Sequence, residues 1–134
     1  MEGTLARLIL AVLIAAGLFG AYRAMTAIVL SRAGRKARRL AQFTPGTPGV
    51  LYFTTPDCAT CKAAQKPALR ALAERLPGSV QVIEIDAVDN AAMAREWSVL
   101  SVPTTFVLDR DGTPRQVNHG FASVDKLMGQ LASL

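Results

Sequence analysis

The chain is poor in the side chains that most often bind metals or carry out hydrolysis, because its 134 residues include two cysteines and one histidine. A structural zinc site needs about four ligands, so these residues could complete one only with a carboxylate or with a second copy of the chain. An iron–sulfur cluster bridged between two chains is chemically possible, but no further residue pattern in the sequence supports it. There is also no Gly-rich loop opening a helix around phosphate, and no serine–histidine–acid arrangement. The sequence therefore predicts no metal and no cofactor.

Charge is missing from residues 8–22, LILAVLIAAGLFGAY, and after Arg23 the apolar character resumes as far as Leu30. As a helix, residues 8–22 reach about 22 Å and residues 8–30 about 34 Å, whereas the hydrocarbon core of a bilayer is about 30 Å thick. The longer stretch therefore predicts one transmembrane helix. Arg23 costs about 2.5 to 3.5 kcal/mol at mid-membrane, but it lies near the end of the stretch and can extend toward the headgroups.

The alternative for this stretch is a cleaved secretory signal, since signals also hold a short apolar run near the N-terminus. The side chains before the run contribute one cation, Arg7, and Tyr22-Arg23-Ala24 is a poor match to a small-residue cleavage site. We therefore expect an uncleaved anchor that contacts membrane lipid.

Positive charge is concentrated in the N-terminal part. Residues 1–41 carry seven Lys/Arg against one acid, whereas residues 42–134 carry eight against nine. A nucleic-acid binder needs its cations on the folded face that meets phosphate, so we predict no nucleic-acid partner. Five cations follow the apolar stretch, where they would meet lipid headgroups, and one precedes it, which favours a cytoplasmic location for residues 42–134. These five residues form a basic cluster: Arg32, Arg35, Lys36, Arg38 and Arg39.

The remaining sequence predicts a linker and one α/β domain. QFTPGTPG, at residues 42–49, holds two prolines and two glycines that end any helix coming from the membrane. We therefore divide the chain into an anchor with its basic segment (1–41), a linker (42–48) and a domain (49–134). Hydrophobic periodicity predicts strands over 49–55, 80–86 and 104–109, a hairpin turn at 109–112 before a fourth strand, and a helix over 59–76. It also predicts a short helix capped by Asn90 that runs to about Trp97, and a last helix capped by Ser123. This order predicts a mixed four-stranded sheet with helices on both faces.

The two cysteines lie in TTPDCATCK, residues 54–62. Cys58 follows a predicted buried strand and begins a helix, where free N–H groups and the positive end of the helix dipole stabilise a thiolate. Cys61, one turn later, lies on the same side and is close enough to form a disulfide. This arrangement favours a nucleophilic thiol backed by a resolving thiol.

From about residue 47 to its end, the chain resembles the thioredoxin superfamily. The motifs that carry the resemblance are CATCK at residues 58–62, Pro67 in the following helix, WSVLSVPT at residues 97–104, and DRDG followed by Gly120. The resemblance implies a thioredoxin-like fold with Cys58 as the attacking thiol and Cys61 as the resolving thiol. It further implies a cis peptide at Val102–Pro103 and a substrate-binding segment made of Val102, Pro103 and Thr104.

Several positions depart from the thioredoxin pattern. Asp57 replaces the tryptophan that often precedes the first cysteine; it is expected to cap the helix, and a charge there would otherwise raise the thiol pKa. Tyr52 stands where a buried acid often assists proton transfer to the resolving thiol, and Val82 replaces that acid's lysine partner. The dipeptide Ala59-Thr60 differs from Gly-Pro, so the reduction potential does not carry over.

Two further residues are candidate modulators of the thiols. His119, the single histidine, precedes Gly120 and could carry protons or tune a thiolate, although a lone histidine at a strand end is more often a surface group. Lys62 would add positive charge near the thiols unless it extends into solvent.

Together these features predict a membrane-anchored thiol–disulfide oxidoreductase that reduces protein disulfides and is itself reduced by an unidentified electron donor. A redox-silent module that binds a partner in the same groove is the alternative. The resemblance also includes anchored relatives that work outside the cytoplasm, for instance in cytochrome c maturation, against the cytoplasmic location that the basic cluster favours.

Overall fold

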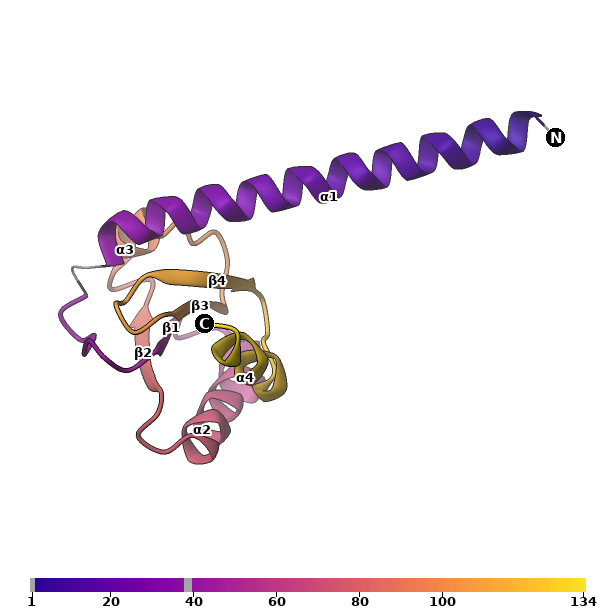
Figure 1. The fold of residues 1–134 in the computed structure, drawn as a ribbon. Helices are drawn as coiled ribbons and strands as arrows, with labels where there is room; N and C mark the ends of the chain where they lie inside the picture. Colours follow the sequence, from indigo (N-terminus) through magenta and orange to yellow (C-terminus); the bar gives the residue numbers. More distant parts are fainter. Residues whose placement is uncertain (1, 38–39) are drawn as a thin grey trace.

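A four-stranded sheet carries helices on both faces, and one long helix, α1, continues far beyond the sheet (Figure 1). The structure is a computed structural model that describes residues 2–37 and 40–134. Arg38 and Arg39, two cations of the basic cluster, lie outside the described residues.

The sheet has the strand order β2-β1-β3-β4, with β1 parallel to β2, and with β3 antiparallel to both β1 and β4. The parallel pair needs a helical crossover, whereas the short turn at residues 109–112 makes the last pair antiparallel. The predicted mixed four-stranded sheet is confirmed. The strands are β1 (Gly49–Thr54), β2 (Gln81–Asp86), β3 (Thr104–Leu108) and β4 (Pro114–His119).

Hydrophobic side chains fill a layer on each face of the sheet. On one face the Trp97 ring packs against Phe106 and Phe53, with ring centroids 5.0 and 6.3 Å away. On the other face Leu72 and Leu127 are fully buried with the strand residues beneath them. The first layer is covered by α1 and α3 (Ala91–Glu96), and the second by α2 (Lys66–Arg75) and α4 (Val124–Ala132).

One of the three predicted helix caps is present. The Ser123 hydroxyl accepts the N–H of Lys126 at 3.3 Å and caps α4, as predicted. The side-chain cap predicted for Asn90 at α3 is wrong, because the Asn90 amide instead donates to the Asp86 carbonyl at 3.1 Å. The Asp86 carboxylate accepts the N–H of Val88 at 2.8 Å, and this turn directs Asn90 back toward the end of β2.

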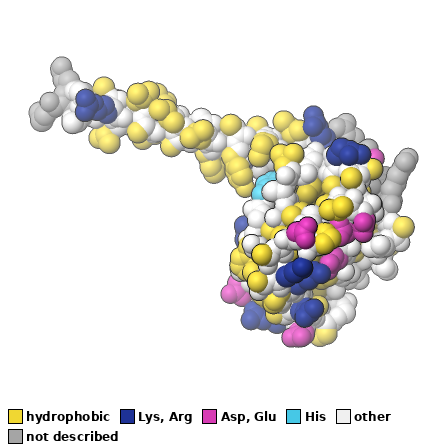
Figure 2. Space-filling model, turned by 180° about the vertical axis from the view of Figure 1, so that it is seen from behind, with side chains coloured by type: hydrophobic (Ala, Val, Ile, Leu, Met, Phe, Trp, Pro, Cys, Tyr) yellow, Lys and Arg dark blue, Asp and Glu magenta, His cyan; other side chains and the backbone are white. Residues whose placement is uncertain are grey.

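The helix α1 (Glu2–Ala37) is exposed along its first part and packed on the domain along its last part. Every residue from 3 to 25 is exposed. Beyond them, Val29 and Ala33 are 8% and 0% exposed and belong to the hydrophobic layer that contains Trp97. Residues 3–33 are long and apolar enough to cross a membrane, a property that signal sequences share. Figure 2 shows hydrophobic side chains along the projecting part.

Candidate active site

At one end of the sheet, called the active-site edge below, strands β1 and β4 end and strand β3 begins. The register places Phe53 of β1 opposite Thr104 of β3, and Thr104 opposite His119 of β4. The segment with both cysteines leaves β1 at this edge, and Pro103 immediately precedes β3. The sheet therefore brings the CATCK motif, the predicted substrate-binding segment and the single histidine to one end of the domain.

The helix that carries the cysteines is wider at its start than an ordinary α-helix. Residues Cys61–Gln65 form a π-helical turn, and the N–H of Lys66 donates to the carbonyl of Cys61, five residues earlier. Pro67 follows in the first turn of α2. Because proline has no N–H and its ring crowds the carbonyl four residues before it, the π-turn accommodates Pro67 without breaking the helix. The helix predicted over residues 59–76 is thus present, with this local widening.

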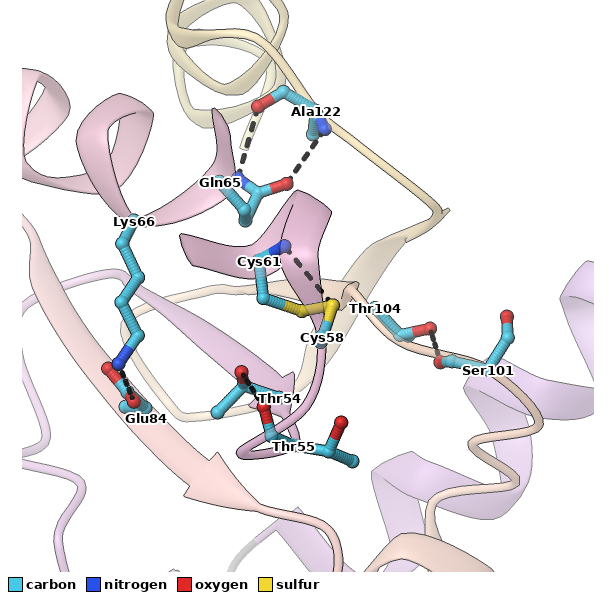
Figure 3. Close-up of a disulfide and its surroundings, with 10 residues drawn as sticks. All are labelled: Thr54, Thr55, Cys58, Cys61, Gln65, Lys66, Glu84, Ser101, Thr104 and Ala122. Atoms are coloured by element: carbon cyan, nitrogen blue, oxygen red, sulfur yellow. Dashed lines mark hydrogen bonds and ion pairs between the residues drawn. A yellow bond between two sulfur atoms is a disulfide. The ribbon is translucent and has the colours of Figure 1, made fainter. Parts of the chain in front are cut away.

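Cys58 and Cys61 form a disulfide, with their Cα atoms 5.2 Å apart (Figure 3). Cys61 is 0% exposed, whereas Cys58 is half-buried. The N–H of Cys61 donates to the Cys58 sulfur at 3.1 Å, so this sulfur caps the helix. The cap predicted for Asp57 is therefore wrong: its side chain is exposed and makes no hydrogen bond among the described residues. The sulfur already occupies the position that a capping carboxylate would take.

The loop before β3 is held in place from both sides. The Val102–Pro103 peptide bond is cis, as expected. The Thr104 hydroxyl donates to the Ser101 carbonyl at 2.7 Å, and the N–H of Gly120 donates to the Pro103 carbonyl at 2.8 Å. Gly120 has a φ of 88°, which glycine adopts without steric cost. The end of β4 thereby fixes the proline loop at the edge where the cysteines lie.

The cysteine pair, the cis-proline and the sheet order together match a known family. The model of the thioredoxin family matches residues 37–133 of the chain. The chain belongs to the thioredoxin family. Members of this family are thiol–disulfide oxidoreductases, and this thioredoxin-family protein has the C-x-x-C spacing of their cysteine pair.

The similarity to individual thioredoxins is partial. The thioredoxin of Bacillus subtilis (strain 168) is 31% identical over 75 residues, which cover 56% of this chain and 70% of that protein. The thioredoxin of Porphyra purpurea is 32% identical over 60 residues, and the match spans 45% of this chain and 55% of that protein. Among solved structures, thioredoxin-2 of the malaria parasite is 26% identical, with a TM-score of 0.62, covering 66% of this chain and 84% of that one.

Gln65 is a site-supporting residue that the sequence did not reveal. Its side chain is 0% exposed and makes two hydrogen bonds to Ala122. The amide nitrogen donates to the Ala122 carbonyl at 3.1 Å, and the amide oxygen accepts the Ala122 N–H at 2.9 Å (Figure 3). These bonds tie the cysteine helix to the segment between Gly120 and α4. The available signal was a polar residue on the buried face of an amphipathic helix, one turn after Cys61.

The position of the missing acid is filled by a buried phenol. Tyr52 is fully buried, and its hydroxyl has no hydrogen-bond partner among the described residues. Burial raises the pKa of Tyr52 above its usual value, and the Glu84 carboxylate adds to the increase, whereas the nearby Thr54 hydroxyl, which does not reach hydrogen-bonding geometry, partly opposes it. Glu84 lies opposite Tyr52 on β2 and forms an ion pair with Lys66 at 2.8 Å. Val82, as expected, supplies no charge here.

We predict that Tyr52→Phe stabilises the fold by about 1 kcal/mol at neutral pH, because a buried hydroxyl without a partner carries a desolvation cost. The raised pKa of Tyr52 makes the folded state favour the protonated phenol. The contribution of Tyr52 to the free energy of unfolding is therefore fully present below the pKa of this phenol in the unfolded chain, about 10, and is lost as the pH rises above that value. Urea unfolding from pH 7 to 11 should show an alkaline loss in the parent that is smaller in Tyr52→Phe. An equal alkaline loss in both would contradict this assignment.

Both candidate modulators lie at the surface of the domain. Lys62 is exposed and extends into solvent. His119 is exposed and lines a groove of about 680 Å³ between α1 and the segment around Leu100, and neither cysteine lines this groove. The structure describes no cluster of three or more metal-binding side chains within residues 2–37 and 40–134.

Proposed function

We propose that the chain is a membrane-anchored thiol–disulfide oxidoreductase in which Cys58 attacks protein disulfides and Cys61 resolves the intermediate. The difference in burial between the two sulfurs is the observation that carries the assignment. Cys58 is half-buried at the start of the helix, where a substrate sulfur can approach, whereas Cys61 is 0% exposed behind it. One thiol is therefore open to the substrate and the other only to its partner.

In the reducing direction, the Cys58 thiolate forms a bond to one substrate sulfur as the substrate disulfide breaks, and the released substrate thiolate takes a proton from water. Cys61, after losing its proton, attacks the Cys58 sulfur and releases the second substrate thiolate. The substrate gains two electrons, and the protein is left with the Cys58–Cys61 disulfide that the structure contains. A dithiol donor must then reduce this disulfide.

The cis-proline loop, at the same end of the sheet as the cysteines, supports a role for Val102, Pro103 and Thr104 in holding substrate. Because proline has no N–H, Pro103 leaves a gap in the backbone donors next to the sulfurs. The Val102 backbone can then pair with an extended substrate segment, as in β-strand addition. A redox-silent binding module would use the same segment.

A redox titration of the full chain in detergent separates these two functions. The free thiols are counted in thiol–disulfide buffers of increasing reduction potential, and we expect one two-electron transition. A midpoint near about −270 mV would indicate a reductant, and one near about −120 mV an oxidant. If the two thiols stay reduced across that whole range, the oxidoreductase assignment fails and a binding module replaces it.

The anchor rests on α1, whose described residues from 3 to 25 are exposed and predominantly apolar. We propose that it is retained as a single span and that the domain lies in the cytoplasm, since more cations follow the apolar stretch than precede it. To test the side, Asp111→Cys places one exposed thiol in a chain that lacks Cys58 and Cys61. We expect an impermeant thiol reagent to label it in cell lysates and not in intact cells. Labelling in intact cells would place the domain outside.

A further inference from the structure

The exposed part of α1 leaves the domain at the edge that carries the active site. His119 and Leu100 line the groove beside Met25 and Ile28 of α1. At the other end of the sheet, Phe43 lies against the hairpin turn, where a Cβ placed on Gly112 would come within 3.0 Å of its ring. The chain therefore runs from the active-site edge toward the hairpin as it passes over the sheet, and its earlier residues project past the active-site edge (Figure 1).

The projecting part of α1 holds one charge-free stretch, residues 8–22, between Arg7 and Arg23. Residues 3–25 are exposed, and Thr26 is the first residue of α1 that the domain partly covers. At 1.5 Å per residue, these 23 residues reach about 34 Å, close to the hydrocarbon thickness of about 30 Å. The charge-free residues alone reach about 22 Å, which is too short to cross, so the span has to include the residues on to Arg23. The membrane surface must therefore lie near Met25, next to the active-site edge.

The charges and apolar groups at this junction fit a lipid surface. Arg7 and Arg23 bracket the charge-free residues 8–22, so the long side chains at both ends can reach headgroups. Arg32 and Arg95 line the groove and add positive charge at the domain side. The apolar side chain of Leu100, in the loop that leads to the cis-proline, is 88% exposed. A lipid surface beside this loop would cover it.

From these observations we infer the substrate class: disulfides of integral membrane proteins that lie close to the bilayer surface. This inference rests on the proposed function, because it takes the span and the cysteine chemistry as given. The span holds the active-site edge toward the headgroups, and the buried contacts of Val29 and Ala33 keep the domain from turning away. A disulfide far above the membrane would have to reach around the domain to meet Cys58.

The orientation is tested first, without redox chemistry, on the full chain in lipid nanodiscs. A fluorescent label is placed at Leu100→Cys or at Asp111→Cys, each in a chain that lacks Cys58 and Cys61, and quenchers are attached to lipid headgroups. The two positions lie at opposite ends of a sheet about 20 Å long. We expect the quenching at position 100 to exceed that at position 111 by at least about threefold, given this separation. Equal quenching, or stronger quenching at position 111, would overturn the orientation.

Substrate preference is tested with two membrane-spanning peptides that carry the same disulfide. In one peptide the disulfide directly follows the span, and in the other a stiff proline-rich spacer of about 20 residues lifts it about 60 Å above the surface. We expect the unmodified chain to reduce the first peptide about ten times faster, because confinement near the surface raises the effective concentration. Equal rates would overturn the substrate class and leave the oxidoreductase intact. If neither peptide is reduced, the proposed function itself fails.

A pair of variants on one helix turn provides the control. Ala33→Glu puts a charge into the buried contact between α1 and the domain, whereas Ser31→Glu adds the same charge at an exposed position. We expect Ala33→Glu to release the domain and bring the ratio of the two reduction rates toward one, and Ser31→Glu to keep the ratio. If Ala33→Glu keeps the full preference while its label at position 100 is no longer quenched, the orientation does not set the preference and the inference is wrong.

Discussion

Replacing Cys58 by serine should lower disulfide reduction by at least about a thousandfold, to the uncatalysed background, because the first bond to the substrate is made by this sulfur. Cys61→Ser should behave differently. Its Cys58 thiolate still attacks, but the mixed disulfide has no internal thiol to release it, so a covalent complex with the substrate should accumulate. The measurement is turnover of a fluorescent disulfide substrate, together with non-reducing gels that detect the complex.

The two variants control for one another, because each removes one sulfur from the same helical turn. Unchanged secondary structure by circular dichroism would show that both are folded. Turnover by Cys58→Ser at the parent rate would contradict the mechanism outright. A complex trapped with Cys58→Ser and not with Cys61→Ser would reverse the two roles, in conflict with the complete burial of Cys61.

The second large effect concerns the core beneath the active-site loop. Trp97 is 1% exposed and stacks edge to face on Phe106, with interplanar angle 71°. Trp97→Ala should lower the free energy of unfolding by about 3 to 5 kcal/mol, through lost burial and the cavity left behind. Because Trp97 begins the segment that leads to Pro103, disulfide reduction should also fall. Urea unfolding followed by far-UV circular dichroism, in detergent, measures the first effect.

Leu100→Ala is the matched control for this substitution. It removes a large apolar side chain from the same segment, but at a position that is 88% exposed. We expect its free energy of unfolding to stay within about 0.5 kcal/mol of the parent value. A loss as large as that of Trp97→Ala would mean that Leu100, and not the aromatic cluster, supports this segment.

The sheet and the cysteine turn were predictable because local pattern determines them. Cys58 and Cys61 stand three residues apart in a helix that follows a buried strand, and this spacing alone puts both sulfurs on one side. A large aromatic residue directly after a short helix is also expected in the core, where Trp97 lies. In these cases the residues that decide the structure are close together in the sequence.

Contacts between distant segments were not predictable in the same way. The apolar face of α1 at Val29 and Ala33 looks the same in the sequence whether lipid or protein covers it, so the sequence alone extends the membrane stretch to Leu30. Gln65 bonds to the backbone of Ala122, 57 residues away, and no local pattern encodes such a partner. Asp57 failed as a cap because a sulfur competed for the same N–H group.

The bonds between Gln65 and Ala122 have a consequence for how the protein passes between its two redox states. They are made by an uncharged amide with main-chain groups, so neither gain nor loss of a proton at the sulfurs alters them. The helix and the segment after β4 can therefore keep one arrangement while the bond between the sulfurs opens and closes. Because these contacts are the same in the oxidised and the reduced form, little reorganisation energy is needed at each turnover. This suits repeated cycling between a donor and a substrate.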